Sequence, residues 1–184
     1  MIIAFKNNNN RGFTLIELLI TLAVAGILFS IAVPSLSKTV NNTHQTSVLH
    51  TLFTHLNLAR TQAILEKQHI LLCKSIDGVQ CITQSAWSDG WLIFADTDNN
   101  KIVNGDEQVI HVQQALPGTI YLNYSGFGSN NYFRYFSDGH SSANGTFTLC
   151  SNSDEALAQS IIVSRTGRVR IDNKTGSGKP LVCS

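Results

Sequence analysis

The chain has 184 residues, a formal net charge of +1 at pH 7 and 43% hydrophobic residues, with only three prolines. This composition excludes an intrinsically disordered chain, and the length leaves room for one domain with a substantial core but not for two large domains. The near-zero net charge indicates no class of partner, so the distribution of charge along the chain is the more informative property.

The first element is an apolar run from Phe13 to Val33, 21 residues that contain one charge, Glu17. As a helix this run spans about 32 Å, which is enough to cross the roughly 30 Å hydrocarbon core of a bilayer. Lys6 and Arg11 precede the run, so the positive-inside rule keeps the N-terminus cytoplasmic and sends the remainder outward. An ordinary signal anchor does not explain Glu17, because a charge in a membrane helix is costly without a partner.

The stretch Gly12 to Glu17, GFTLIE, with the apolar helix that follows it, resembles the class III leader and N-terminal helix of type IV pilins and pseudopilins. The resemblance implies that a prepilin peptidase cuts between Gly12 and Phe13 and that the new amine is methylated. It also implies that Glu17, the fifth residue of the mature chain, neutralises the N-terminal amine of a neighbouring subunit during filament assembly. A buried carboxylate beside an ammonium group is then a paired charge rather than an isolated one.

Pro34 should kink the helix, because proline lacks an N–H and clashes with the preceding turn. Helical periodicity then resumes to about residue 66, with one apolar stripe of Val48, Leu52, Leu56, Ala59 and Ala63. We therefore expect a leader peptide over residues 1–12, a transmembrane and filament-core helix over 13–34, and a pilin domain over 35–184 that includes the second half of the helix.

After Lys67 the hydrophobic period changes to 2, and turn residues separate about eight short segments. The segments are HILLCKS, GWLIFAD, EQVIHVQ, TIYLNY, FRYF, GTFTLC, SIIVSR and RVRI. One long helix followed by these strands predicts an α+β, type IV pilin-like fold in which an antiparallel sheet packs on the second half of the helix.

Four cysteines lie beyond the apolar run, on the side of the membrane that we expect to be oxidising. An even count there favours disulfides, and three pairings are possible. We favour Cys73–Cys81, which closes a short strand-turn segment, and Cys150–Cys183, which attaches the C-terminal tail to a strand. Free buried thiols are the alternative.

Three further segments, in the right order, resemble the GspH/FimT family of minor pilins and pseudopilins. They are LNLARTQAILEKQHILLC, WSDGWLIFADTDNNKIVNGDEQVI, and GTFTLC followed by SIIVSRTGRVRI. The resemblance covers nearly the whole mature chain, although only the N-terminal motif is highly specific.

An acidic turn places Asp96, Asp98 and Asn100 at alternate positions, with Glu107 at position twelve counted from Asp96. This spacing matches a calcium loop, which needs several oxygen ligands around one cation. However, Lys101 stands where a tight calcium loop needs glycine, and Asx residues make turns without a metal. We therefore expect no metal and no other cofactor.

The C-terminal segment is basic. Residues 35–164 carry six Lys/Arg and ten Asp/Glu, a net of −4, whereas residues 165–184 carry five Lys/Arg and one acid, a net of +4. Thr166 and Gly167 can form a hairpin turn with Arg165 at its tip. Arg168 and Arg170 then project from one strand face about 6.7 Å apart, while Val169 and Ile171 point to the core.

A row of guanidinium groups beside the flexible residues Lys174 and Lys179 suits the phosphates of a polyanion. Gly167-Arg168-x-Arg170 resembles the G-R-x-R element of FimT-type minor pilins associated with DNA uptake in natural transformation. By that resemblance the DNA-binding residues are Arg165, Gly167, Arg168, Arg170, Lys174 and Lys179. The alternative is an edge strand protected from aggregation by its charges. After Phe136 the only aromatic residue is Phe147, so base stacking near the tail is poorly supported.

No catalytic motif accompanies the six histidines, so we do not expect an enzyme. The sequence predicts a minor type IV pilin that binds DNA through its backbone, independently of base sequence. Other pilin subunits and the prepilin peptidase would be its further partners. It would be held in the bacterial inner membrane with its domain in the periplasm, and then reach the pilus surface. The alternative is a structural minor pilin or a pseudopilin of a type II secretion filament, without DNA binding.

Overall fold

The computed structural model describes residues 14–105, 107–151 and 154–183 and separates into two compact units, Met1–Val40 and Asn41–Ser184. Its only α-helix among these residues, α1 (Leu15–Glu66), begins in the first unit and continues into the second. The helix continues through Pro34, so the proline does not end it. The predicted long helix, which we expected to extend to about residue 66, is confirmed.

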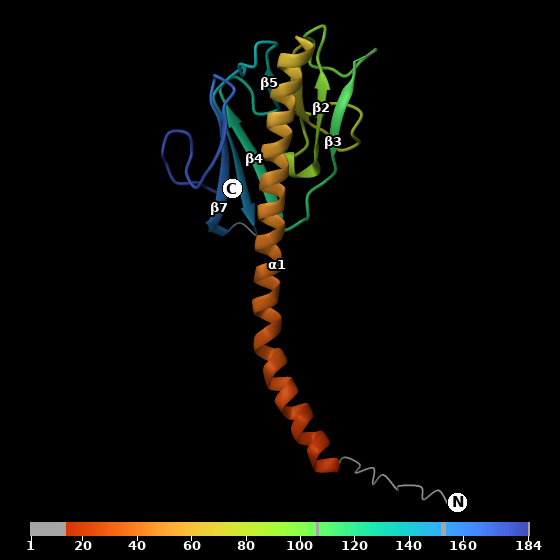
Figure 1. The fold of residues 1–184 in the computed structure, drawn as a ribbon, viewed down its shortest axis with the longest axis vertical. Coiled ribbons are helices and arrows are strands. Elements are labelled where there is room, and N and C mark those ends of the chain that lie inside the picture. Colours follow the sequence, from red (N-terminus) through yellow and green to blue (C-terminus); the bar gives the residue numbers. More distant parts are fainter. Residues whose placement is uncertain (1–13, 106, 152–153, 184) are drawn as a thin grey trace, which may run out of the picture. The chain divides into compact units, whose positions relative to one another are not determined.

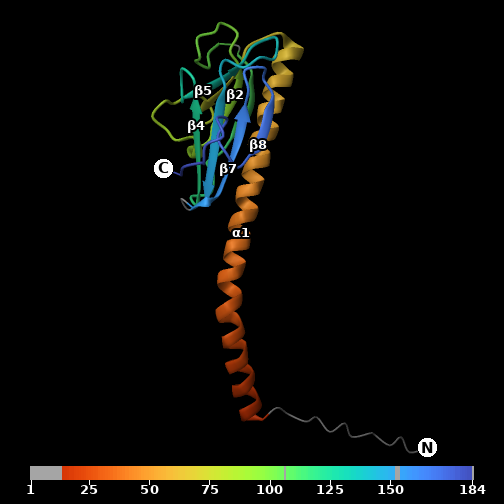
Figure 2. The same cartoon turned by 90° about the vertical axis from the view of Figure 1, so that its left-hand side faces the viewer.

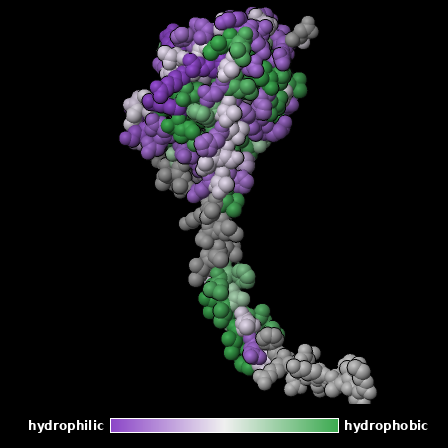
Figure 3. Space-filling model, in the orientation of Figure 1, coloured by the Kyte–Doolittle hydropathy of each residue, from purple (hydrophilic) through white to green (hydrophobic). Residues whose placement is uncertain are grey.

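The described part of the first unit is helical and strongly apolar. Figure 3 shows this stretch mostly in the green of hydrophobic residues. Its large apolar side chains are exposed in the single chain, among them Leu15, Ile16, Leu19, Leu22, Ile27, Leu28 and Phe29. Side chains of this kind need another apolar environment, either lipid or neighbouring helices.

The second unit contains the remainder of α1 and all of the strands. The strands are β1 (Ile70–Lys74), β2 (Trp91–Ala95), β3 (Val109–Gln113), β4 (Ile120–Gly126), β5 (Tyr132–Tyr135), β6 (Gly145–Ser151), β7 (Asp154–Val163) and β8 (Val169–Asp172), with a short 3-10 helix, η1 (Trp87–Asp89). All eight predicted strand segments are present.

The strands form two antiparallel sheets rather than the single sheet that we expected. The first sheet has the order β3-β2-β1-β5 and the second has the order β4-β6-β7-β8. Figure 1 shows the C-terminal part of α1 with β2 and β3 on one side and β4 and β7 on the other. The split arises from the pairing of β1 with β5, because β5 follows β4 in the chain yet joins the other sheet.

One main core joins α1 to the inner faces of both sheets. The predicted helix stripe is buried from Leu52 to Ala63, and Leu49 joins it, while Val48 is only half-buried. From the sheets the core receives Trp91, Phe133, Tyr135, Phe147, Ile161 and Val163, among others. Each large side chain removed from water contributes about 1.5–3 kcal/mol, so this core fixes the position of both sheets on the helix.

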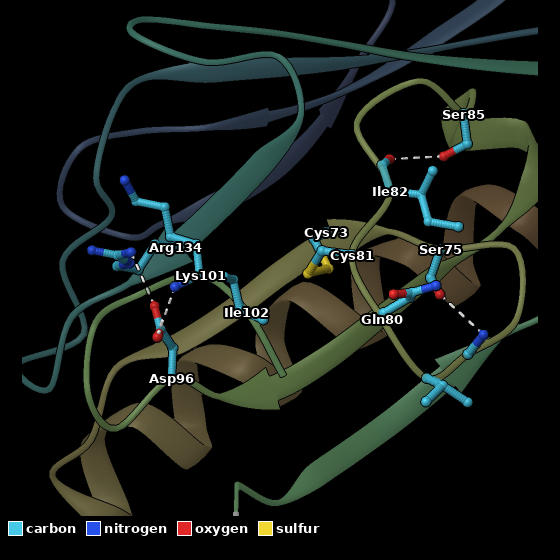
Figure 4. Close-up of a disulfide and its surroundings, with 12 residues drawn as sticks. Cys73, Ser75, Gln80, Cys81, Ile82, Ser85, Asp96, Lys101, Ile102 and Arg134 are labelled. Atoms are coloured by element: carbon cyan, nitrogen blue, oxygen red, sulfur yellow. Dashed lines mark hydrogen bonds and ion pairs between the residues drawn. A yellow bond between two sulfur atoms is a disulfide. The ribbon is translucent and has the colours of Figure 1, made fainter. Parts of the chain in front are cut away.

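The outer face of the first sheet has a smaller apolar cluster of Leu71, Cys73, Leu92 and Phe94. The Cys73–Cys81 disulfide lies there, with a Cα–Cα distance of 5.6 Å. Figure 4 shows this disulfide between the loop that carries Gln80 and Ile82 and the acidic turn that carries Asp96 and Lys101. The favoured pairing of these two cysteines is therefore present.

Candidate nucleic-acid interface

The turn between β7 and β8 has the hairpin geometry that the sequence predicts. Ser164 N–H donates to the Arg168 carbonyl at 3.0 Å, and Gly167 N–H donates to the Ser164 carbonyl at 2.8 Å. Arg165 and Thr166 are exposed at its tip. The turn thus presents Arg165 to solvent.

Gly167 builds this turn and is itself buried. Its φ is +81°, and a Cβ at this position would lie 1.9 Å from the carbonyl oxygen of Gly139. Only glycine meets both conditions without strain. Of the six residues predicted to bind DNA, Gly167 therefore shapes the turn rather than offering an exposed contact.

The carbonyl oxygens of the turn accept hydrogen bonds from other parts of the domain. Arg60 on α1 donates through Nη2 to the Thr166 carbonyl at 3.0 Å and through Nε to Gly139 O at 3.1 Å. The Tyr135 hydroxyl donates to the Gly167 carbonyl at 3.4 Å, and Ser141 donates to the carbonyls of Arg165 and Ser164. These contacts hold the turn in one conformation. They were not predicted from the sequence.

Arg168 and Arg170 lie on the outer face of the second sheet, away from α1. Arg170 pairs with Ile162 of β7, whereas Val169 pairs with Val163, which belongs to the main core. Both arginines are exposed and line one groove. Arg170 also makes an ion pair of 3.7 Å with Asp172 that is largely open to solvent, so Asp172 competes with any anion for this guanidinium.

Ile171 differs from the expectation that it points to the core. It pairs with the core residue Ile161 and shares its face of the sheet, yet it remains 38% exposed. The cause is the position of β8, which is the edge strand of the second sheet. Figure 2 shows β8 on the side of β7 opposite to β4.

The C-terminal tail forms the other wall of the groove. Its residues Gly176, Ser177 and Lys179 line the groove together with Arg168 and Arg170, and the groove has a volume of about 1000 Å³. Lys174 is exposed but is not among the lining residues. Lys179 therefore joins the two arginines, while Lys174 and Arg165 lie outside the groove.

Several contacts fix the tail against the sheet. Ser160 on β7 donates its hydroxyl to the carbonyls of Asp172 and Lys174, at 3.1 and 2.6 Å. Cys150 on β6 is joined to Cys183, with a Cα–Cα distance of 5.9 Å, and Leu181 is buried beside this disulfide. This is the pairing that we favoured. Closing a loop of 33 residues stabilises the fold by about 3–4 kcal/mol in the chain-entropy model.

The acidic turn brings together three of the four predicted calcium ligands. Carboxylate oxygens of Asp96, Asp98 and Glu107 lie within 4.8 Å of one another. Asp96 is fully buried and accepts from Arg134 Nη2 at 3.0 Å, so a guanidinium already supplies the positive charge. Figure 4 shows this ion pair and the bond from the Lys101 backbone to Asp96.

The other two carboxylates of this turn also accept bonds from the protein. Glu107 accepts from Thr97 N–H at 2.8 Å and from Asn104 N–H at 3.3 Å. Asp98 accepts from both the backbone N–H and the side-chain amide of Asn100, the fourth predicted ligand. Each of the three carboxylates therefore accepts hydrogen bonds from groups of the protein.

The histidines do not assemble a catalytic group within the described residues. His140 makes an exposed ion pair with Asp138 at 3.2 Å, but the neighbouring Ser141 hydroxyl donates to two backbone carbonyls. His55 is buried and accepts from Trp91 Nε1 at 3.2 Å. Desolvation, aided by nearby His111, lowers the pKa of His55 to about 4. This histidine stays neutral as a core residue.

At the N-terminus, Glu17 caps its own helix. One carboxylate oxygen accepts from Thr14 N–H at 2.9 Å and from the Thr14 hydroxyl at 3.0 Å, while Glu17 N–H donates to that hydroxyl at 3.3 Å. This is a capping box.

Gly12 and Phe13, the predicted cleavage and methylation site, lie outside the described residues. Within the described part of the chain, no helix has the length and hydropathy required to cross a membrane.

The chain matches two family models. "Type II transport protein GspH" matches residues 49–167, and "Prokaryotic N-terminal methylation motif" matches residues 7–33. A long helix packed on two antiparallel sheets, with this N-terminal motif, defines the class of minor type IV pilins and pseudopilins. Within this class the chain belongs to the GspH family. Neither matching family is catalytic, and the GspH match ends at Gly167, before Arg168.

Individual proteins agree with this assignment. The chain is 27% identical over 178 residues to the pilin-like protein PilA1 of Thermus thermophilus, covering 88% of this chain and 98% of the relative. Among solved structures it resembles the type IV minor pilin FimU of Pseudomonas aeruginosa, with a TM-score of 0.56, 16% identity, and coverage of 77% and 96% of the two chains. It also resembles the minor pseudopilin EpsH of Vibrio cholerae, with a TM-score of 0.53, 13% identity, and coverage of 70% and 96%. At these identities the two structures support the fold alone.

Proposed function

We propose that this minor pilin binds DNA at the groove between β8 and the C-terminal tail, as a step in DNA uptake for natural transformation. The observation that carries the proposal is that Arg168, directly before β8, and Arg170, two residues further on, line one groove with Lys179. Guanidinium and ammonium groups in a row are suited to phosphate oxygens. The contacts read no base edges, so binding is independent of sequence and falls steeply with salt.

The anchored turn makes this groove a better phosphate site than charge alone would. Arg60, Tyr135 and Ser141 fix the backbone that precedes Arg168. A preorganised backbone loses less conformational entropy on binding. The turn carbonyls already accept hydrogen bonds from Arg60, Tyr135 and Ser141, which offset part of their negative charge.

The proposal also covers how the chain is processed and where in the cell it is located. The prepilin peptidase removes residues 1–12, Phe13 is methylated, and residues 13–34 are held in the bacterial inner membrane before assembly. The domain that follows faces the periplasm and then the cell surface. In the filament, Glu17 exchanges its bonds to Thr14 for the N-terminal amine of a neighbouring subunit. The exposed apolar side chains of the first unit support this placement.

The test is a titration of the full chain in detergent with labelled duplex DNA at low and moderate salt. The Arg168→Gln/Arg170→Gln variant should lose most of the binding, and its salt slope should fall by about 2, one for each phosphate contact. The matched control is Lys67→Gln/Lys101→Gln, which removes the same charge from exposed positions outside the groove. Thermal melts check that both variants are folded.

A purely structural role in pilus assembly or in a secretion pseudopilus is the second candidate function. The observation that favours it is the edge position of β8, where charged residues prevent pairing with other chains, and where Arg170 already has Asp172 as a partner. Absence of DNA binding by the wild type at low salt would support this role and overturn the first.

A further inference from the structure

The floor of the groove is a row of side chains that crosses the whole second sheet. Arg170 on β8 pairs with Ile162 on β7, which pairs in turn with Thr146 on β6. Thr146 then pairs with Ser125 on β4. Paired residues of neighbouring strands lie side by side on one face of a sheet, and all four of these residues line the groove. The groove therefore extends from one edge strand of the sheet, β8, to the other, β4.

The length of this row and its charges distinguish it from a path along β8. Three strand spacings of about 4.8 Å give the row a length of about 14 Å, roughly twice the separation of Arg168 and Arg170 along the chain. Along β8, the next residue on the same face after Arg170 is Asp172, a partly exposed acid outside the groove. The groove-lining residues, all of them described, include three cations and no carboxylate. An extended polyanion therefore meets no acid on the path across the sheet.

Beyond Arg170 the row offers hydroxyl groups that can still donate. Ser125 is exposed, and its hydroxyl has no hydrogen-bond partner among the described residues. The Thr146 hydroxyl oxygen accepts from Gly176 N–H of the tail at 3.4 Å, which leaves its own proton for an outside acceptor. Hydroxyl side chains are common donors to phosphate oxygens in complexes with DNA. Ile162, which lies between Arg170 and Thr146, is buried and adds an apolar floor.

We infer that the DNA backbone bound in this groove crosses the strands of the second sheet, and that Thr146 and Ser125 bind its phosphates beyond Arg170; this rests on the proposed function. Arg168, Arg170 and Lys179 supply the charge at one end of the bound segment. The two hydroxyl groups fix the direction in which the segment continues. Because these contacts reach phosphates alone, they add affinity without selecting a base sequence.

The first test adds a cation at the far end of the row. The full chain in detergent is titrated with labelled duplex DNA at several salt concentrations. Ser125→Arg should bind about tenfold tighter near 0.1 M salt, and its salt slope should be steeper by about 1, because one more phosphate is neutralised. The control Gln84→Arg adds the same charge at an exposed position outside the groove and should leave the slope unchanged.

The second test removes the hydroxyl groups. Ser125→Ala/Thr146→Val should weaken binding about tenfold with an unchanged salt slope, because neutral groups displace no counterions. Ser125→Ala alone should weaken it about threefold, and this variant leaves the bond between Thr146 and the tail intact. The control Thr61→Val/Ser142→Ala removes the same groups from exposed positions outside the groove and should change neither quantity. Thermal melts check that every variant is folded.

The outcomes separate this inference from the proposed function. If Ser125→Arg has the same slope as Gln84→Arg, or if Ser125→Ala/Thr146→Val binds as tightly as the wild type, the DNA does not cross the sheet. The proposed function still stands in that case, provided that Arg168→Gln/Arg170→Gln loses binding. If the wild type does not bind DNA at low salt, the proposed function fails and the inference fails with it.

Discussion

Arg60 and Thr166 are joined by a hydrogen bond of 3.0 Å from the Arg60 guanidinium to the Thr166 carbonyl. The same guanidinium donates to Gly139 O, so one helix residue holds two turns that are far apart in the sequence. Through this contact α1 fixes the β7–β8 turn, and with it the segment that carries Arg168 and leads into β8.

Replacing Arg60 should weaken DNA binding without removing a phosphate contact. Arg60→Met leaves two carbonyls without their donor, which we expect to cost about 1–3 kcal/mol of stability. DNA affinity should fall while the salt slope stays at the wild-type value, because Arg168, Arg170 and Lys179 are all retained. Duplex titrations at several salt concentrations measure both quantities. A reduced slope would mean that Arg60 itself contacts phosphate.

Gly167 and Gly178 form a matched pair for testing the turn. Both have positive φ, +81° and +80°, but only Gly167 has an atom in the place of a Cβ. We expect Gly178→Ala to cost about 1–2 kcal/mol from backbone conformation alone, and Gly167→Ala about 2–5 kcal/mol because overpacking against Gly139 is added. Denaturant unfolding of the two variants gives the comparison. Equal losses would contradict the close approach of Gly139.

The Arg134–Asp96 pair should be strongly coupled. Arg134→Leu leaves Asp96 as an unpaired charge in a fully buried position, which we expect to cost about 3–5 kcal/mol. The double variant Arg134→Leu/Asp96→Leu should recover part of that loss, because no charge is then left buried. Chemical denaturation of the wild type, of Arg134→Leu, of Asp96→Leu and of the double variant completes the cycle. A single variant as stable as the wild type would show that the pair does not hold the acidic turn.

His55 should make the domain less stable in acid. Its folded pKa of about 4 lies below the ordinary value of 6.5 that applies to the unfolded chain, so the unfolded state takes up the proton first as pH falls. The stabilisation is fully present above pH 6.5 and is lost towards pH 4, a change of about 3 kcal/mol. The measurement compares the wild type with His55→Gln, so that the contribution of this one side chain is isolated. Between pH 4 and pH 6.5 the unfolding free energy of the variant should depend less on pH than that of the wild type. The same pH dependence in both proteins would contradict the lowered pKa of His55.

The elements of this fold could be predicted from local patterns. Apolar spacing predicted α1 and its buried stripe, alternation predicted all eight strands, and Thr166-Gly167 predicted the hairpin turn. The division into two sheets could not be predicted, because it depends on β1 pairing with β5 across a long stretch of chain.

The candidate site was predicted only in part, for the same physical reason. The spacing of Arg168 and Arg170 fixed their common face, because strand geometry is local. The contributions of Arg60 and Arg134 depend on contacts between distant segments. Arg60 shows this best, because it lies 106 residues before Thr166 in the chain and yet donates to its carbonyl.

The position of β8 also governs how the domain responds to force. An edge strand is held through its backbone on one side only, here by four residue pairs with β7. A pull on Arg168 along the strand loads this ladder in shear, so that its hydrogen bonds share the force, whereas a sideways pull peels them apart in sequence. The bonds from Arg60, Tyr135 and Ser141 reinforce the turn end, where peeling would start. The domain would therefore resist a force applied through a ligand in the groove best when that force runs parallel to β8.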